Sequence, residues 1–406
     1  MISVREALDR ILAELPLLPA ETVDLAHARG RALAEDVVAR VTQPPADVSA
    51  MDGYAVRAED VAKVPARLSC IGEAPAGQAF AGAVGPGEAV RIFTGGPVPK
   101  GADAIVIQED AEGGGDDGAV VVREAAAKGR YIRPAGLDFR AGDVGLRAGR
   151  LLGAREIGLA AAMNVPWLAV RRRPRVALLA TGDEIVRPGE PIGPNQIVSS
   201  NALALAALVE AAGGEAVDLG IARDDAASVR RLAAGAAGVD MLVTLGGASV
   251  GEHDLIRSVL GQEGLQLEFW QIAMRPGKPL MFGRLGGTAM MGMPGNPVSS
   301  LVCGLIFLRP ALRKMLGLPA DEGLRRSAVL GRDLVANDRR EDYLRASLAR
   351  NAEGELVATP FEKQDSSMLS HLANADCLAV RPPHAPAATA GERIEIVPLD
   401  VEVGAI

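Results

Sequence analysis

The sequence has few aromatic residues and no excess of positive charge. Aromatic residues make up 3% of the 406 positions, and the formal net charge is −8. A nucleic-acid surface needs basic side chains to neutralise phosphates and aromatic rings on which bases stack. We therefore expect no nucleic-acid partner. A small polyanion stays open as a ligand, provided that local Lys, Arg or backbone amides offset the acidic background.

Cysteines are scarce, and long apolar runs are missing. Cys70, Cys303 and Cys377 are odd in number and widely spaced, with no CxxC pair. This pattern indicates neither a disulfide framework nor a zinc site. No apolar run reaches the length that spans a bilayer, and the first residues lack a basic flank followed by an apolar segment. We expect a cytoplasmic protein with no membrane partner.

The length and the turn residues indicate several ordered domains. A chain of 406 residues exceeds one ordinary core and predicts roughly two to four domains. Its 47 glycines and 26 prolines fall between periodic segments, which indicates many turns rather than disorder.

The middle of the chain alternates short apolar runs with helical spacing. The stretch 239–254 is central: an apolar run breaks into glycines, a hydroxyl and a carboxylate, and helical spacing follows. This alternation predicts a mostly parallel α/β sheet with right-handed crossovers. The expected strands are 176–180, 216–221, 239–245, 267–272, 279–282 and 288–293, and the expected helices are 202–212, one capped by Asp225, and a long one after Ser299.

The flanking regions have other patterns. A capping box at Ser3 predicts an amphipathic helix over 3–15. Residues 23–41 look like a short strand and a second helix, and residues 61–150 are β-rich. After residue 319, about five short strands separated by Pro and Gly suggest a small β-barrel or sandwich. These strands are expected at 327–335, 343–350, 355–359, 376–381 and 393–397.

Ligand-like turns follow the central strands. Because the carboxyl ends of parallel strands share one edge, such turns should converge there and favour a phosphorylated or nucleotide ligand. Arg275 and Lys278 would supply cationic charge. Glu184, Asp224 and Asp254 could bind Mg²⁺ together with ligand phosphate oxygens, although each acid alone is more often a helix cap or a solvated turn. The turns lie at Thr181, Ser199 to Asn201, Gly246, Arg275 and Pro294.

The combination and order of several motifs closely resemble the molybdopterin molybdenumtransferases, which are related to the E domain of gephyrin. Each motif alone is weak, whereas together they span nearly the whole chain. They are SAMDGYA (49–55), IFTG (92–95), TGDE (181–184), SN (200–201), GGASVG (246–251), PGKP (276–279) and PGNPVS (294–299).

The resemblance implies an elongated homodimer of four-domain chains in an α/β multidomain class. The central domain would be a mostly parallel three-layer α/β unit, with an elongated helical and β N-terminal region and a C-terminal β-barrel. The implied domains are 1–24 with 142–173 (helical, dimerisation), 25–141 (β-rich), 174–322 (α/β, molybdopterin-binding) and 323–406 (β-barrel).

The resemblance also implies the reaction. Molybdate would be inserted into adenylylated molybdopterin with loss of AMP, assisted by Mg²⁺. Implied partners are the molybdopterin adenylyltransferase and client molybdoenzymes. The substrate-binding positions would be Ser200, Asn201, Gly246, Gly247, Ser249, Gly251, Pro294, Gly295 and Asn296. Molybdate would bind at Arg275, Lys278, Ser299, Arg345 and Ser366. Positions important for activity would be Asp52, Thr94, Asp138, Glu184, Asp224 and Asp254, with Glu184, Asp224 and Asp254 at the metal; Asp52, Thr94 and Asp138 would reach the cleft across the dimer interface.

Some positions depart from the family pattern. Arg275 stands where the family usually has Lys, and a guanidinium is a wider, forked donor. Ala248 replaces a usual Val and Leu255 a usual aromatic residue. Asp365 brings negative charge beside Ser366, which leaves molybdate and tungstate both open as the oxyanion. Two other functions stay open: a molybdopterin adenylyltransferase, and a non-catalytic cofactor carrier or scaffold.

Overall fold

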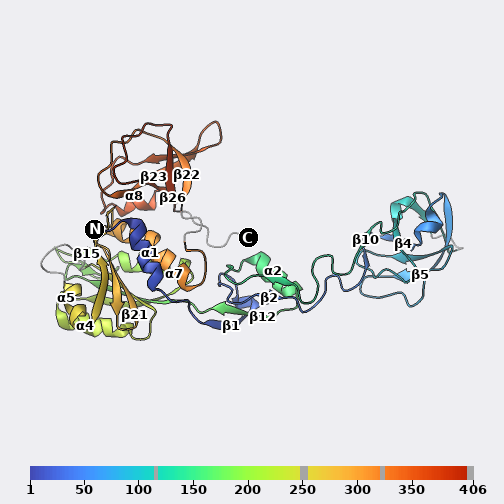
Figure 1. Cartoon of the computed structure of the whole chain (residues 1–406), viewed down its shortest axis with the longest axis horizontal. Coiled ribbons are helices and arrows are strands. Elements are labelled where there is room, and N and C mark those ends of the chain that lie inside the picture. Colours follow the sequence, from blue (N-terminus) through green and yellow to red (C-terminus); the bar gives the residue numbers. More distant parts are fainter. Residues whose placement is uncertain (114–117, 247–254, 321–324, 400–406) are drawn as a thin grey trace.

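The chain folds into three lobes, and a narrower middle segment lies between the N-terminal lobe and the other two (Figure 1). The computed structural model describes residues 1–113, 118–246, 255–320 and 325–399. In Figure 1 the N-terminal lobe (48–133) lies at one end and the central lobe (175–315) at the other, with the C-terminal barrel (326–398) beside the central lobe. The expected multidomain α/β class is confirmed. Within the described ranges, no helix has both the length and the apolar character needed to traverse a bilayer.

The central lobe is built on one six-stranded sheet in the order β16-β13-β17-β21-β20-β18. The first four strands in this order pair in parallel, and the last two pair antiparallel at one edge. The mostly parallel sheet expected from the sequence is therefore present. Its strands are β13 (Arg175–Thr181), β16 (Glu215–Ala222), β17 (Met241–Leu245), β18 (Leu265–Trp270), β20 (Met281–Leu285) and β21 (Thr288–Met293).

Both faces of this sheet are covered, which explains why its strands read as continuous apolar runs. In β13, Val176 and Leu178 join one buried cluster, whereas Ala177 and Leu179 join the cluster on the opposite face. The layers are thus helix, sheet, helix, as expected. One face carries α3 (Asn201–Ala211), α6 (Pro297–Cys303) and α7 (Arg309–Met315), with a π-helical turn Gly304–Leu308 between the last two; the other carries α4 (Ala226–Ala233) and α5 (Leu255–Gln262).

The first helix, α1 (Val4–Glu14), packs on the central lobe. The side chain of Ser3 accepts a hydrogen bond from the Glu6 amide (3.1 Å) and caps the helix. Val4, Ala7 and Ile11 then fall on one face and join the core cluster that contains α6 and α7. The resemblance implied that this helix belongs with residues 142–173, but its apolar face is buried against the central lobe. The remaining domain boundaries stay a prediction.

The middle segment consists of short strand pairs around one helix, α2 (Ala154–Ala162). The prediction of a helix within 23–41 is wrong: the helical structure in this range is limited to a 3₁₀ turn, Leu25–His27. Gly30 has φ +73°, and the following backbone bonds across the segment, with the Leu33 amide donating to the Arg150 carbonyl (2.8 Å). Tertiary pairing outweighs local helix propensity here. The strand pairs are β1 (Ala20–Asp24) with β12 (Trp167–Arg171) and β2 (Val37–Val38) with β11 (Val144–Leu146).

The N-terminal lobe holds a second six-stranded sheet, in the order β7-β4-β6-β5-β9-β8. A short pair, β3 (Val48–Ser49) with β10 (Ile132–Arg133), lies where the lobe meets the middle segment. The β-rich character expected here is confirmed. The strands are β4 (Gly53–Val56), β5 (Ala66–Ala74), β6 (Glu88–Ile92), β7 (Ala104–Ile107), β8 (Ala111–Gly113) and β9 (Ala119–Val122).

The C-terminal strands close into a five-stranded barrel, because β23 pairs with both β24 and β25. A short strand of the central lobe, β19 (Met274–Arg275), adds to the barrel by pairing in parallel with β23. The barrel strands are β22 (Arg326–Leu330), β23 (Glu341–Arg350), β24 (Leu356–Pro360), β25 (Cys377–Arg381) and β26 (Arg393–Pro398), and a short helix α8 (Leu369–Ala373) precedes β25.

Candidate functional site

A pocket of about 1000 Å³ lies at the carboxyl edge of the central sheet. It forms because β13, β17 and β21 end side by side and are followed by small or polar turns. The turns at Thr181, Asn201, Gly246 and Pro294 therefore converge, as the sequence predicted. Predicted site residues that line the pocket are Glu184, Ser200, Asn201, Asp224, Gly246, Pro294, Gly295, Asn296 and Ser299.

The pocket floor is made of closely approaching backbone. Gly246 has φ +89°, and a Cβ on it would meet the Thr181 carbonyl at 3.0 Å. A Cβ on Gly295 would lie 3.7 Å from the Gly246 Cα. The two turns thus touch through glycine, which lets a ligand approach the main chain. The Asn201 side-chain amide ties the rim together by donating to the Gly295 carbonyl (2.7 Å).

One wall of the pocket is apolar. It comes from a short parallel pair, β14 (Ile185–Val186) with β15 (Ile197–Val198). Ile197 is 63% exposed and Val198 41% exposed, so this wall is open to solvent. The sequence did not single out these residues, since two-residue apolar stretches between polar residues are a weak strand signal. Such a wall suits the flat face of a ring system.

Two carboxylates, Glu184 and Asp224, line the pocket and are exposed. The loops that carry them are joined by two reciprocal contacts from a backbone amide to a side-chain carboxylate: the Asp183 amide lies 3.4 Å from Oδ2 of Asp224, and the Asp224 amide lies 3.3 Å from Oδ1 of Asp183. Within the described ranges, neither Glu184 nor Asp224 has a cationic partner. The described part of the chain also contains no group of three or more His, Cys, Asp or Glu side chains placed to hold a metal. The pair suits a Mg²⁺ ion that takes its other ligands from water and phosphate oxygens.

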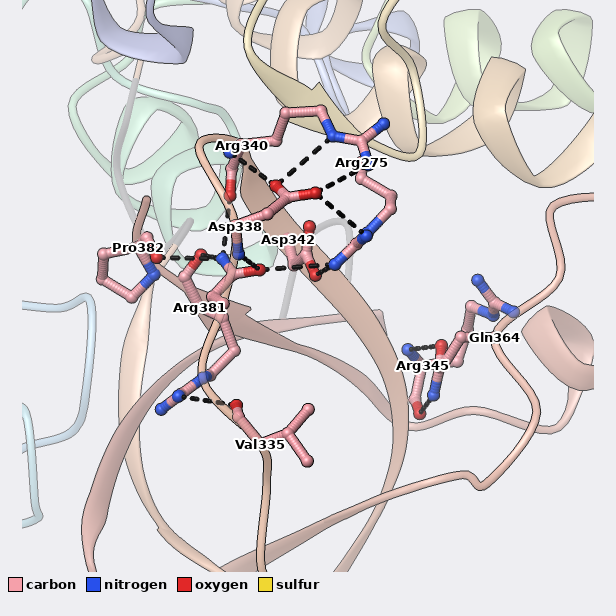
Figure 2. Close-up of polar contacts among 10 residues, drawn as sticks. Arg275, Val335, Asp338, Arg340, Asp342, Arg345, Gln364, Arg381 and Pro382 are labelled. Carbon is pink, nitrogen blue, oxygen red and sulfur yellow. Dashed lines mark hydrogen bonds and ion pairs between the residues drawn. The ribbon is translucent and has the colours of Figure 1, made fainter. Parts of the chain in front are cut away.

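Two of the three cations expected at the oxyanion site, Lys278 and Arg275, have different surroundings. Lys278 is half-buried, precedes the pocket-lining Pro279, and has no ammonium partner among the residues that the structure describes. The Arg275 guanidinium instead lies between the carboxylates of Asp338 and Asp342 of the barrel (Figure 2). Arg275 lines a separate cavity of about 390 Å³ rather than the pocket.

The barrel reaches the pocket through the loop that carries Ser366. The Asn296 side chain donates to the Ser366 hydroxyl (2.9 Å), and the Val298 amide donates to the Ser366 carbonyl (3.2 Å). Arg345, which is fully buried, donates from Nη2 to the Asp365 carbonyl (2.9 Å). Burial lowers the pKa of Arg345. Arg345 lines the smaller cavity, so it supports the loop from behind.

Three predicted residues lie outside the central lobe. Thr94 donates to Oδ1 of Asp52 from its amide (2.6 Å) and from its hydroxyl (2.7 Å), and these bonds lower the pKa of Asp52. Asp138 is exposed in the chain that leads back to the middle segment. The N-terminal lobe and the central lobe lie at opposite ends of the elongated molecule (Figure 1), so one chain does not bring these residues to its own pocket. The predicted positions Gly247, Ser249, Gly251 and Asp254 lie outside the described residues.

Comparison with known proteins accounts for almost the whole chain. Residues 2–164 match the MoeA N-terminal region (domains I and II), residues 177–314 match a probable molybdopterin binding domain, and residues 327–399 match the MoeA C-terminal region (domain IV). The three matches follow one another in the order of the lobes.

Full-length relatives agree with these matches. The chain is 38% identical over 385 residues to molybdopterin molybdenumtransferase 2 of Mycobacterium tuberculosis, covering 92% of this chain and 94% of that protein. It is 33% identical to the molybdopterin molybdenumtransferase of Haemophilus influenzae over 100% of both chains. The crystal structure of the molybdopterin biosynthesis MoeA protein from Pyrococcus horikoshii superposes with a TM-score of 0.85 at 30% identity, over 98% of this chain and 100% of that one.

Proposed function

The chain belongs to the molybdopterin molybdenumtransferase family, and from this premise we propose that it inserts molybdate into adenylylated molybdopterin with release of AMP. Its relatives are named as transferases, and its domains are those of molybdenum cofactor biosynthesis. One observation carries the proposed substrate form and leaving group: the pocket at the carboxyl edge of the central sheet joins a backbone floor, an apolar wall and a polar rim in one space of about 1000 Å³.

The parts of the pocket suit the parts of this substrate. The turns at Gly246 and Gly295 let phosphate groups lie against the main chain, and the wall of Ile185, Ile197 and Val198 suits a ring. Ser299 is 5% exposed and lines the pocket. With Lys278 and Ser366 it would hold a tetrahedral oxyanion near the dithiolene, and holding both reactants in one pocket lowers the barrier.

Glu184 and Asp224 would hold a magnesium ion. An ion held there would supply positive charge to offset that of the phosphates, including the charge that would develop on departing AMP. The two carboxylates fit this role because each lines the pocket and neither is paired with a cation in the described part of the chain. Asp254, which belongs to the same predicted set, lies outside the described residues.

We propose that the protein acts as a homodimer. Asp52 and Thr94 form one polar unit in the N-terminal lobe, remote from the pocket of the same chain. A second copy would bring its own Asp52, Thr94 and Asp138 toward this pocket. A cytoplasmic location, with a molybdopterin adenylyltransferase as supplier and molybdoenzymes as recipients, agrees with this reaction.

The direct test is to incubate the full chain with adenylylated molybdopterin, Mg²⁺ and molybdate, and to follow AMP. We expect AMP to appear only when molybdate is added. Retained binding of the adenylylated pterin without AMP release would support a cofactor carrier instead. Adenylylation of free molybdopterin by ATP would support an adenylyltransferase. Either outcome would overturn the proposal.

A further inference from the structure

We propose that Arg275 is a positioning residue, not a ligand of the oxyanion: it fixes the C-terminal barrel to the central lobe and thereby fixes where Ser366 meets the pocket. The inference rests on the proposed function, because it concerns which residues of that site bind molybdate. The cluster of Arg275, Asn337, Asp338, Arg340 and Asp342 is called the barrel joint below.

The side-chain bonds of Arg275 all cross from the central lobe to the barrel. Within the described residues its guanidinium bonds to Oδ1 of Asn337 (3.3 Å), to Oδ2 of Asp338 (3.3 Å) and to Asp342. The backbone makes the same connection, because Arg275 is the register partner of Asp342 in the β19–β23 pair. Figure 2 shows the guanidinium held between the two carboxylates.

The positive and negative side chains of the barrel joint are equal in number and pair with one another. Two cations, Arg275 and Arg340, face two carboxylates, Asp338 and Asp342, and Arg340 donates to Oδ2 of Asp338 at 2.9 Å. Arg332, Arg345 and Arg381 also line the adjoining cavity, but an oxyanion would have to displace a carboxylate before it could bond to the Arg275 guanidinium. Asp342 is 4% exposed, so removal of its cation would leave a buried charge without a partner.

Strand β23 connects the barrel joint to the pocket. It carries Asp342 and, on the same strand, Arg345, whose backbone amide and carbonyl bond to the Gln364 side chain (both 3.0 Å). Arg345 also holds the Asp365 carbonyl, and Ser366 follows directly in the chain. Ser366 then accepts from Asn296 at the pocket rim. A shift of β23 at Asp342 would thus be transmitted to Ser366.

A ligand role for Arg275 makes the opposite prediction. If Arg275 bound the oxyanion, Asp342 would compete with it, and removal of the Asp342 charge would strengthen binding. If Arg275 positions the barrel, removal of either charge loosens the same contact. Asp342→Asn therefore separates the two roles, since it leaves Arg275 in place.

The experiment compares Arg275→Gln, Asp342→Asn and the double variant in the full chain. Amide hydrogen exchange is followed in peptides that cover residues 294–299 and 361–368, and molybdate affinity is measured by calorimetry. We expect each single variant to speed exchange in both peptides and to weaken molybdate binding about tenfold. The double variant should be no worse than either single variant, because both changes break one contact.

Arg325→Gln is the matched control. Arg325 is 42% exposed against 46% for Arg275, and it pairs with Glu341 and Glu395 inside the barrel. Its loss should leave exchange at residues 294–299 unchanged. If Asp342→Asn misfolds, Arg275→Lys replaces it: a lysine keeps one ion pair with Asp342, so exchange near the wild-type rate is expected.

Tighter molybdate binding by Asp342→Asn would overturn the inference, as would unchanged exchange in both single variants or fast exchange in a folded Arg275→Lys. These readouts do not need the transfer reaction. A wild-type chain that releases no AMP would therefore refute the proposed function separately from the role of Arg275.

Discussion

The pocket region and the barrel joint contain similar charged side chains, but only those of the barrel joint form ion pairs within the described part of the chain. Glu184 and Asp224 at the pocket, and Lys278 next to the pocket-lining Pro279, have no ion-pair partner within the residues that the structure describes. At the barrel joint, Arg275 and Arg340 are matched by Asp338 and Asp342. Charges left open can bind a ligand, whereas charges paired within the protein hold its parts together. The type of residue alone does not distinguish the two uses.

The largest expected effect comes from an open cation of the site. Lys278→Ala should lower kcat/KM for molybdate by about 100-fold or more, because a charged group that stabilises a transition state contributes roughly 3 kcal/mol. It should leave the melting temperature unchanged, since no described residue loses a partner. AMP release and thermal melts check this, with Lys314→Ala on the exposed side of α7 as the control. Activity retained by Lys278→Ala would remove it from the site.

The turn that separates Arg275 from Lys278 should be the most sensitive point for stability. Gly277 has φ +115°, and a Cβ on it would lie 2.6 Å from Sγ of Cys303 and 3.0 Å from Sδ of Met274. Gly277→Ala should therefore cost about 2–4 kcal/mol, from backbone strain and overpacking together.

Urea denaturation measures this cost. The control is Gly286→Ala, at φ +58° with nothing within 4 Å of its Cβ, which should show backbone strain alone. Equal losses in Gly277→Ala and Gly286→Ala would show that the turn has room to adjust.

Acid should weaken the contacts of Asp338 in the barrel joint over a defined pH range. Hydrogen bonds from Arg340, aided by Arg275, lower the pKa of Asp338 from 3.8 to about 2. Its stabilisation is therefore present above about pH 4 and is lost as the pH falls toward 2. The Asp338 side chain is 44% exposed, so solvent screening reduces the effect to about 1 kcal/mol or less.

This range can be tested with Asp338→Asn, which should be slightly less stable at pH 6 and lose less stability between pH 4 and pH 2. Chemical denaturation at several pH values would show it. A variant with the same acid dependence as the wild type would mean that Asp338 is not held by the joint.

The smallest expected effect concerns the Cys303 thiol, which lies against the turn at Gly277. Cys303 is fully buried with Sγ 3.8 Å from the Gly277 carbonyl oxygen, and burial raises its pKa. Burial, with a smaller contribution from the charge of Asp376, raises the pKa of Cys377 to about 12. In the native protein at pH 8, iodoacetamide should modify Cys70 and leave Cys303 and Cys377 unmodified, as peptide mass spectrometry would show. Modification of Cys303 at the rate of Cys70 would show that the loop over it opens.

The sequence predicted the pocket better than it predicted the joint. Turns after parallel strands must share an edge, so the convergence of Thr181, Gly246 and Pro294 follows from strand periodicity. The pairing of Arg275 with Asp342 joins residues 67 positions apart, and nothing in local spacing signals it. For this reason, the sequence analysis did not identify Asp342. The packing of α1 on the central lobe was missed likewise, since an amphipathic pattern shows which face is buried but not against what.

The most direct test of the contrast between an open pocket and a closed joint uses tungstate, an electron-dense analogue of molybdate. Crystals of the full chain soaked in tungstate should show an anomalous peak within hydrogen-bonding distance of Lys278, Ser299 or Ser366, with Arg275 still on Asp342. A peak on the Arg275 guanidinium, with Asp342 displaced, would contradict the account.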